Sequence, residues 1–191
     1  YGSVFGNKDS YNDVIQKGAF AESIKSHKSS QTMPAMLWQH DSSQPIGVWN
    51  DITEDANGLH MRGQLAMGTV KGKEAYELAK MGALNGLSIG FVAKGWEYAQ
   101  GGEVRSLTEL ELWEVSLVTF PANTKARITG VKSTEEIATL KDAERVLRDS
   151  GFSKQDALAF VSRVKTLSSR SDSDDMGELK SALEKLKSKL S

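Results

Sequence analysis

The sequence predicts an α+β protein with one main domain and a C-terminal helical appendage. Segments of alternating apolar and polar residues, separated by Gly-, Asn- and Pro-containing turns, recur up to about residue 130 and are typical of strands joined in hairpins. Beyond about residue 131, helix caps and helical periodicity replace this pattern. With 191 residues the chain is long enough for a domain with a sizeable core and such an appendage.

The composition excludes several classes of function. The chain is 39% hydrophobic and 26% charged, as expected of a globular protein, and it has no apolar run that would span a membrane. A net charge of −1 and a pI near 6.4 indicate neither nucleic acid nor an anionic membrane as a partner. Without cysteine there are no disulfides, thiolate metal sites or cysteine nucleophiles. The chain begins inside a predicted strand, so we expect that its native N-terminus has been trimmed.

The first third of the chain is expected to form four strands and one short helix. The strands are predicted at 1–5, 35–38, 46–49 and 59–65, and the helix from about 20 to 26. The Asn57-Gly58 pair predicts the turn that opens the fourth strand. The Asp41-Ser42-Ser43 cluster predicts another turn, so His40 would lie at the exit of the buried strand 35–38.

A predicted helix over 69–81 leads into a strand that contains Ser88. Leu87, Ile89 and Phe91 alternate with Ser88 and Gly90, which predicts that the serine points away from the core. Glycines on both sides would let a peptide approach the serine oxygen closely. This strand is expected to run outward to 98, turn at a Gly-Gly pair and return over 104–120, where a proline ends it.

The returning strand contains one anomaly. Strict alternation predicts a single shared face for Leu110, Leu112, Glu114, Ser116 and Val118. A carboxylate among leucines on a buried face is costly unless it is paired. We therefore expect Glu114 to have a partner.

The last third of the chain is expected to be helical. A capping box at 133–136 opens a helix to about residue 149, and a second cap at 153–156 opens another, which predicts a helical hairpin over 131–167. Residues 168–175 are a Ser- and Asp-rich linker. The segment 176–191 has an a/d seam, formed by Met176, Leu179, Leu183, Leu186 and Leu190. Two heptads are too short to be stable alone, so this helix needs its own domain or another chain as a partner.

Ser88, His40 and Glu114 together suggest nucleophilic catalysis. A serine hydroxyl needs a base, imidazole suits that role at neutral pH, and a carboxylate on the far ring nitrogen orients the imidazole. The chain has three histidines; His27 is expected to be solvated and His60 to lie on a strand surface, so His40 is the best-placed base. A zinc hydrolase is disfavoured because no His-Glu-x-x-His motif is present, and no metal or cofactor is expected.

Several blocks of residues, in order, also resemble a known family. They are Gly18-Ala19-Phe20, Leu37-Trp38-Gln39-His40-Asp41, Gly86-Leu87-Ser88-Ile89-Gly90-Phe91, Leu112-Trp113-Glu114-Val115-Ser116-Leu117-Val118 and Pro121-Ala122-Asn123. Over roughly residues 1–130 they resemble the prohead maturation proteases of tailed bacteriophages, a family similar to the herpesvirus capsid assembly proteases. The resemblance implies a closed, mostly antiparallel β-barrel flanked by helices for residues 1–130.

The resemblance also implies an activity and its residues. The protein would be a serine endopeptidase that cleaves scaffold and capsid-protein segments, and often itself, inside the assembling prohead in the bacterial host cytoplasm. Ser88 would be the nucleophile, His40 the general base, and Glu114 would replace the second histidine of the herpesvirus enzymes. Glu111 and Glu109 are alternatives if a bulge shifts the register. Arg127 is a loose candidate for the oxyanion site, for which a backbone N–H near the serine is the safer assumption.

Two other functions fit parts of the pattern. A Ser-His-Glu esterase would normally have the order serine, acid, histidine, with the serine between a strand and a helix, whereas here the histidine comes first and the serine follows a helix. A capsid or scaffold protein without catalysis would explain the helical tail, with possible self-association through it. A fluorophosphonate probe would label the serine of an enzyme and not that of a structural protein.

Overall fold

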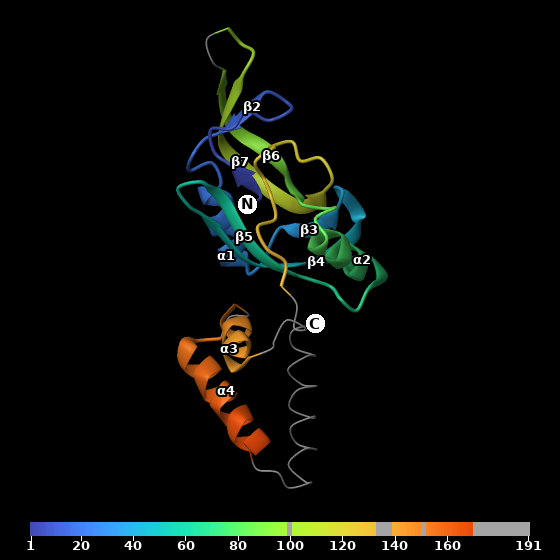
Figure 1. Ribbon diagram of the computed structural model, residues 1–191. Coiled ribbons are helices and arrows are strands. Elements are labelled where there is room, and N and C mark those ends of the chain that lie inside the picture. The colour runs from blue at the N-terminus through green and yellow to red at the C-terminus, as the bar shows by residue number, and fades with distance from the viewer. Residues whose placement is uncertain (99–100, 133–138, 150–151, 170–191) are drawn as a thin grey trace. The chain divides into compact units, whose positions relative to one another are not determined.

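The computed structural model describes residues 1–98, 101–132, 139–149 and 152–169. The chain divides into two compact units, Tyr1–Val131 and Lys132–Ser191. Within the described residues, the first unit contains seven strands and two helices and the second contains two helices (Figure 1). None of the helices in these ranges is long and apolar enough to cross a membrane.

The seven strands of the first unit form a nearly closed, mostly antiparallel β-barrel flanked by helices. The strands are β1 Ser3–Val4, β2 Asp13–Ile15, β3 Ala35–Trp38, β4 Asp41–Glu54, β5 Gly58–Leu65, β6 Gly86–Tyr98 and β7 Arg105–Val118. The strand order is β1-β5-β4-β3-β7-β2, and β6 pairs antiparallel with β7. Only β2 and β3 run parallel to their neighbour β7. The α+β barrel expected from the sequence is confirmed.

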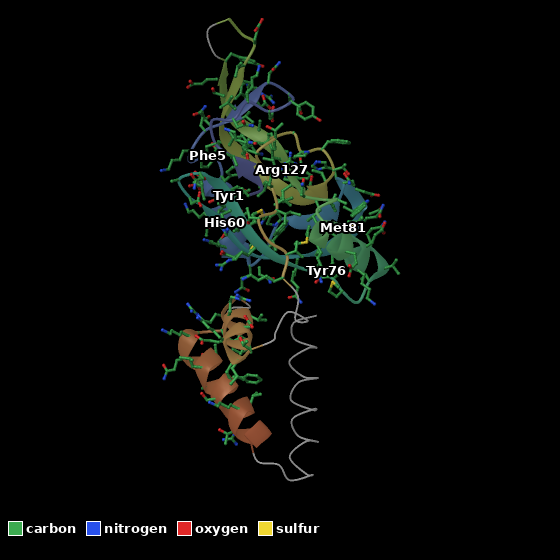
Figure 2. The ribbon with its side chains drawn as sticks, in the orientation of Figure 1. Tyr1, Phe5, His60, Tyr76, Met81 and Arg127 are labelled. Atoms are coloured by element: carbon green, nitrogen blue, oxygen red, sulfur yellow. The ribbon has the colours of Figure 1, made fainter. Side chains whose placement is uncertain are left out.

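The barrel closes through the segment that follows β7. The amino nitrogen of Tyr1 donates to the carbonyl oxygen of Arg127 at 2.9 Å, and both residues are labelled in Figure 2. On the other side of the segment, Leu87 N–H donates to Ala126 O at 3.2 Å, and Ile128 N–H donates to Asn85 O at 2.9 Å. Residues 126–128 therefore lie between the N-terminal end of the chain and the start of β6.

Two helices of the first unit pack against the barrel. Helix α1, Ala21–Ser30, ends four residues later than expected, where Gln31 adopts the left-handed conformation, with φ of 54°. Helix α2, Val70–Lys80, begins at Thr69, whose hydroxyl oxygen accepts the N–H of Gly72 at 3.0 Å. The barrel interior is apolar, and its least exposed side chains are those of Phe20, Ile46, Ile52, Leu59, Leu107, Leu110, Leu112 and Val115.

The turn between β3 and β4 differs from the sequence prediction. Trp38 pairs with Asp41, so the connecting residues are Gln39 and His40, which have φ of 52° and 64°. Positive φ at both central residues is the geometry of a type I′ hairpin turn, which normally uses Asn and Gly. The expected turn at 41–43 is wrong, because β4 begins at Asp41 and continues without interruption to Glu54.

A bulge in β7 resolves the anomaly of Glu114. Gly90 of β6 pairs with Glu114 and Phe91 pairs with Leu112, so Trp113 is an extra residue on β7. Leu110 and Leu112 are core residues just before the bulge, and Val115 and Leu117 are core residues just after it. The predicted common face of Leu112 and Glu114 is therefore wrong, because the extra residue turns Glu114 away from the core.

The second unit contains a pair of helices. They are α3, Leu140–Asp149, and α4, Lys154–Ser169, which pack through Leu147, Ala157 and Val161. Thr139 and Ser153 cap them, accepting the N–H groups of Asp142 and Asp156 at 3.1 Å. The predicted linker over 168–175 is wrong for its first two residues, which belong to α4. The predicted cap at 133–136, the rest of the linker and the a/d segment 176–190 lie outside the described residues.

Candidate active site

The structure brings His40 and Glu114 into direct contact. Nδ1 of His40 lies 2.5 Å from Oε1 of Glu114. The turn residue and the strand residue meet because β3 runs parallel to β7, with Ala35 opposite Glu114 and Trp38 opposite Leu117. The histidine side chain is 42% exposed and that of the glutamate 14%, so the pair lies at the edge of the barrel.

Ser116 connects to both members of this pair. Its hydroxyl donates to Oε2 of Glu114 at 2.6 Å and accepts the backbone N–H of His40 at 3.1 Å. The residue has no exposed surface. Strict alternation predicted a leucine-rich face for this serine, and no role was expected for it. The available signal was its spacing, since residues two apart on a strand share a face and Ser116 follows Glu114 by two.

Ser88 lies directly across from Ser116 in the β6–β7 pairing. Cross-strand neighbours have Cβ atoms roughly 5 Å apart, so the serine is close to the His40–Glu114 pair. Ser88 is only 6% exposed, which is more buried than an open strand face would make it. Within the described part of the chain, neither its hydroxyl nor Nε2 of His40 makes a hydrogen bond.

Ser88 and His40 line the same cleft, whose volume is about 450 Å³. Ile89 and Phe91 of β6 form part of its wall, and Phe120 contributes from the segment after β7. Phe120 is 90% exposed, so an aromatic ring lies at the surface beside the cleft. A cleft of this size with an apolar wall accommodates side chains of a peptide next to the serine.

The pair changes the electrostatics of the imidazole. The hydrogen bond from Nδ1 to Glu114 raises the pKa of His40 above its ordinary value of 6.5, and the negative charge of Glu114 acts in the same direction. Partial burial lowers the pKa of His40, but this effect is smaller than that of the hydrogen bond. The arrangement therefore favours the imidazolium, which is the form that a general base adopts after it has taken a proton.

The glycines beside Ser88 have a different purpose from the one expected. A Cβ on Gly90 would collide with Oε1 and Cγ of Glu114, and a Cβ on Gly86 would collide with Val118 O and the ring of Pro121. Gly90 therefore makes room for the carboxylate that contacts His40. The expectation that both glycines leave space for a peptide is wrong, because other parts of the barrel already fill that space.

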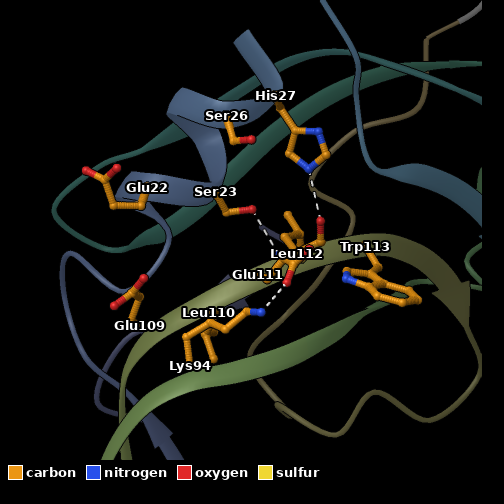
Figure 3. Close-up of a pocket in the computed structure, with 10 residues that line it drawn as sticks. All are labelled: Glu22, Ser23, Ser26, His27, Lys94, Glu109, Leu110, Glu111, Leu112 and Trp113. Atoms are coloured by element: carbon orange, nitrogen blue, oxygen red, sulfur yellow. Dashed lines mark hydrogen bonds and ion pairs between the residues drawn. The ribbon is translucent and has the colours of Figure 1, made fainter. Parts of the chain in front are cut away.

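The alternative carboxylates lie in a different pocket, before the bulge (Figure 3). Oε2 of Glu111 forms an ion pair with Nζ of Lys94 at 2.7 Å, which lowers the pKa of Glu111. Glu109 lines the same pocket of about 430 Å³. His40 does not line this pocket, and its carboxylate partner is Glu114.

The remaining candidate residues lie outside the cleft. Nε2 of His27 lies 2.9 Å from Leu112 O and its Nδ1 lies 3.1 Å from Thr32 Oγ1, so the prediction of a solvated histidine is wrong. His60 lies on β5 and its ring meets the edge of Tyr1 (Figure 2). Arg127 donates to Asn85 Oδ1 at 3.1 Å and does not line the cleft.

Comparison with known proteins gives the class of this barrel and its cleft. The family model of the caudovirus prohead serine proteases matches residues 1–142. The chain is 35% identical over 195 residues to the prohead protease of Enterobacteria phage HK97, covering 98% of this chain and 84% of the relative. It is 29% identical over 144 residues to the prohead protease of Escherichia phage T5, covering 66% of this chain and 68% of the relative.

A third relative has a different kind of name. The capsid polyprotein of Pseudomonas phage PAJU2 is 39% identical over 103 residues, which are 51% of this chain and 15% of that protein. The chain thus belongs to the prohead serine proteases of tailed phages. It is a serine peptidase of prohead maturation.

Proposed function

We propose that this peptidase uses Ser88 as nucleophile, His40 as general base and Glu114 as the carboxylate that orients the imidazole. One observation carries the assignment. His40 is bound through Nδ1 to Glu114 and lines the same cleft as Ser88, while its other ring nitrogen and the hydroxyl of Ser88 make no hydrogen bond within the described residues. A nucleophile, a base and an orienting acid in this relation form the arrangement that activates a serine.

The proposed reaction has two stages. Nε2 of His40 takes the hydroxyl proton of Ser88 as Oγ attacks the carbonyl carbon of the scissile peptide, and the carbonyl oxygen becomes an oxyanion. The C–N bond then breaks, and the imidazolium gives its proton to the leaving amine. In the second stage His40 takes a proton from water, which attacks the acyl group, and the serine hydroxyl is restored as the carboxylate product leaves.

Glu114 acts in both stages through His40. Its carboxylate accepts the Nδ1 proton, which leaves Nε2 as the basic nitrogen, and it stabilises the imidazolium that forms. The raised pKa of His40 has the same cause. The oxyanion is assigned to a backbone N–H near Ser88, because the side chain of Arg127 is bonded to Asn85 outside the cleft.

We propose capsid and scaffold protein segments as substrates, together with segments of the protease itself, inside the assembling prohead. The family supports a site of action in the prohead. The PAJU2 relative, named as a capsid polyprotein, supports capsid protein as the partner of such a peptidase segment. For residues 176–190 we propose self-association or binding to the scaffold, on the strength of their a/d seam.

A fluorophosphonate probe tests the nucleophile directly. The full-length protein should be labelled at Ser88, as read by peptide mass mapping, and Ser88→Ala should abolish labelling and cleavage of a capsid precursor. Ser23→Ala is the matched control, because Ser23 is buried like Ser88 but its hydroxyl accepts an N–H of β7. The Ser23→Ala variant should be labelled like the parent protein. Labelling at another serine, or no labelling at all, would refute the assignment. Hydrolysis of esters without cleavage of peptides would instead favour an esterase.

A further inference from the structure

The backbone of the proposed general base has an unusual conformation. Gln39 and His40 both have positive φ, although neither is glycine or asparagine. Such a conformation costs free energy for residues with a Cβ and persists only where surrounding contacts require it. The position of the imidazole depends on this turn, so the contacts that hold the turn also determine where the imidazole lies.

Three contacts join the turn to β7 and to Thr119, the residue that follows it. Gln39 N–H donates to Leu117 O at 3.0 Å. The Gln39 side-chain amide donates to Thr119 Oγ1 at 2.8 Å and accepts the N–H of Thr119 at 3.2 Å. The third contact is the donation from His40 N–H to Ser116 Oγ. The first two hold Gln39, and the third holds His40 itself.

The direction of the proton in the Ser116 hydroxyl follows from its partners. A backbone N–H can only donate, so Ser116 Oγ must accept from His40. Its single proton then remains for Oε2 of Glu114. The other carboxylate oxygen accepts from Nδ1 of the same histidine, which closes a ring of three hydrogen bonds through three residues. The bond from His40 N–H thus determines that Ser116 donates to Glu114, and that bond leaves Oε1 of Glu114 to accept from Nδ1.

We infer that Ser116 is a positioning residue of the catalytic site. It holds Oε1 of Glu114 against Nδ1 of His40 and holds the backbone of His40 in its left-handed conformation. The inference rests on the proposed function, because it assumes that the imidazole acts as the base. Ser116 itself does not line the cleft, so it acts through the other two residues.

Removing the hydroxyl of Ser116 should break two of the three hydrogen bonds of the ring. In Ser116→Ala, Glu114 loses the donor at Oε2, and the part-buried N–H of His40 loses its acceptor. The carboxylate should then leave Nδ1 for part of the time, and the pKa of His40 should fall towards its ordinary value. The misplacement should lower kcat by up to ~10²-fold with little change in KM.

The decisive measurement is the titration of the His40 ring by NMR in the full-length protein. The Ser88→Ala background prevents self-cleavage during the titration. The pKa of His40 should fall in Ser116→Ala and fall at least as far in Glu114→Gln, and adding Ser116→Ala to Glu114→Gln should cause no further change. An unchanged or higher pKa in Ser116→Ala, or additive effects of the two changes, would overturn the inference. A higher pKa would mean that the serine only weakens the carboxylate as an acceptor.

Two further variants separate positioning from general damage. Ser23→Ala removes another buried hydroxyl that accepts an N–H of β7, that of Leu112 at 2.9 Å, and should leave the pKa of His40 unchanged. Ser116→Thr keeps the hydroxyl and should retain the raised pKa if it folds. The titration does not depend on catalysis, so it can succeed even if His40→Ala remains active. That activity would refute the proposed function and leave the hydrogen-bonded ring in place.

Discussion

Two pockets of the first unit each have a serine and a histidine near a glutamate and differ in how these side chains are bonded. The first is lined by Ser23, His27 and three glutamates, and the second is the cleft lined by Ser88 and by His40, whose ring contacts Glu114. In the first pocket both ring nitrogens of the histidine are bonded and a lysine neutralises one of the glutamates. In the second, one ring nitrogen is bound to the acid and the other is unbonded within the described residues.

The comparison teaches that residue type is a weak guide to catalysis. A serine, a histidine and a glutamate lie near each other in both places. Within the described residues, His40 has one ring nitrogen bound by a carboxylate and the other unbonded, and it lines the same cleft as Ser88. His27 instead joins α1 to β7 through the carbonyl of Leu112, which is a structural role. The following predictions test this contrast.

The largest effect is expected from the two histidines. His40→Ala should lower kcat/KM for a peptide substrate by at least ~10³-fold, because a triad without its base retains little activity. His27→Ala should leave kcat/KM nearly unchanged, although its stability should fall as two hydrogen bonds are lost. Circular dichroism checks that both variants are folded. Comparable kcat/KM values for the two variants would contradict the assignment of His40 as the base and of His27 as a structural residue.

The glutamates should differ in the same way. Glu114→Gln should lower kcat by about 10²–10⁴-fold, because a neutral amide neither selects the tautomer of His40 nor stabilises its charged form. Glu111→Gln removes an exposed ion pair with Lys94 and should leave kcat unchanged. Steady-state kinetics on one peptide measure both. If Glu111→Gln lowers kcat and Glu114→Gln does not, the orienting acid is Glu111, which lies before the bulge.

A third test concerns the space reserved for the acid. Gly90→Ala adds a methyl group where Oε1 of Glu114 lies, so the carboxylate must move away and kcat should fall by about 10²-fold. Gly68→Ala is the control, because nothing lies near the added methyl and the backbone is unstrained there. Equal activity of the two variants would show that the carboxylate can shift without consequence.

The pH dependence gives a smaller but specific signal. Protonated His40 is inactive as a base, so activity should rise with pH through an apparent pKa above 6.5, the direction in which Glu114 shifts it. In Glu114→Gln this midpoint should move to lower pH, while in Glu111→Gln it should stay in place. A pH–rate profile of kcat/KM for the three proteins measures the shift. Profiles without any titration between pH 5 and 8 would exclude an imidazole base.

The smallest effect on catalysis is expected from the tail. Deleting residues 170–191 keeps α4, which ends at Ser169, and removes the a/d segment. Cleavage of a small peptide should be unchanged, because all three proposed catalytic residues lie in the first unit. Self-association or co-assembly with scaffold, measured by light scattering, should fall. Loss of peptide cleavage would assign the tail to the protease core.

The sequence was informative where local patterns agree with tertiary contacts. Alternation located β6, and helical spacing located α2. Ordered motifs selected Ser88, His40 and Glu114 as candidates; the first two line one cleft, and the third contacts the histidine. The failures share a physical cause, which is that tertiary contacts overrode local preference. Gln39 and His40 form a turn without turn residues because β7 binds them, and no local pattern contains that information.

The bulge could not be predicted for a related reason. A strand with an extra residue has the same composition as one without it, and only pairing with β6 identifies Trp113 as the insertion. Strict alternation without the bulge therefore predicts that Glu114 lies among leucines. The role of Gly90 was missed because it depends on the side chain of Glu114, which is distant in the sequence.

The extra residue in β7 also determines which face of the strand carries Glu114. Between Leu110 and Leu117, odd- and even-numbered residues exchange faces at Trp113, so one residue more or less at this point would change which carboxylate faces the histidine. When relatives are aligned, a one-residue gap near this point would equate Glu114 with a core position. In this chain, counting back from the Pro121-Ala122-Asn123 segment reaches Glu114 without crossing the bulge.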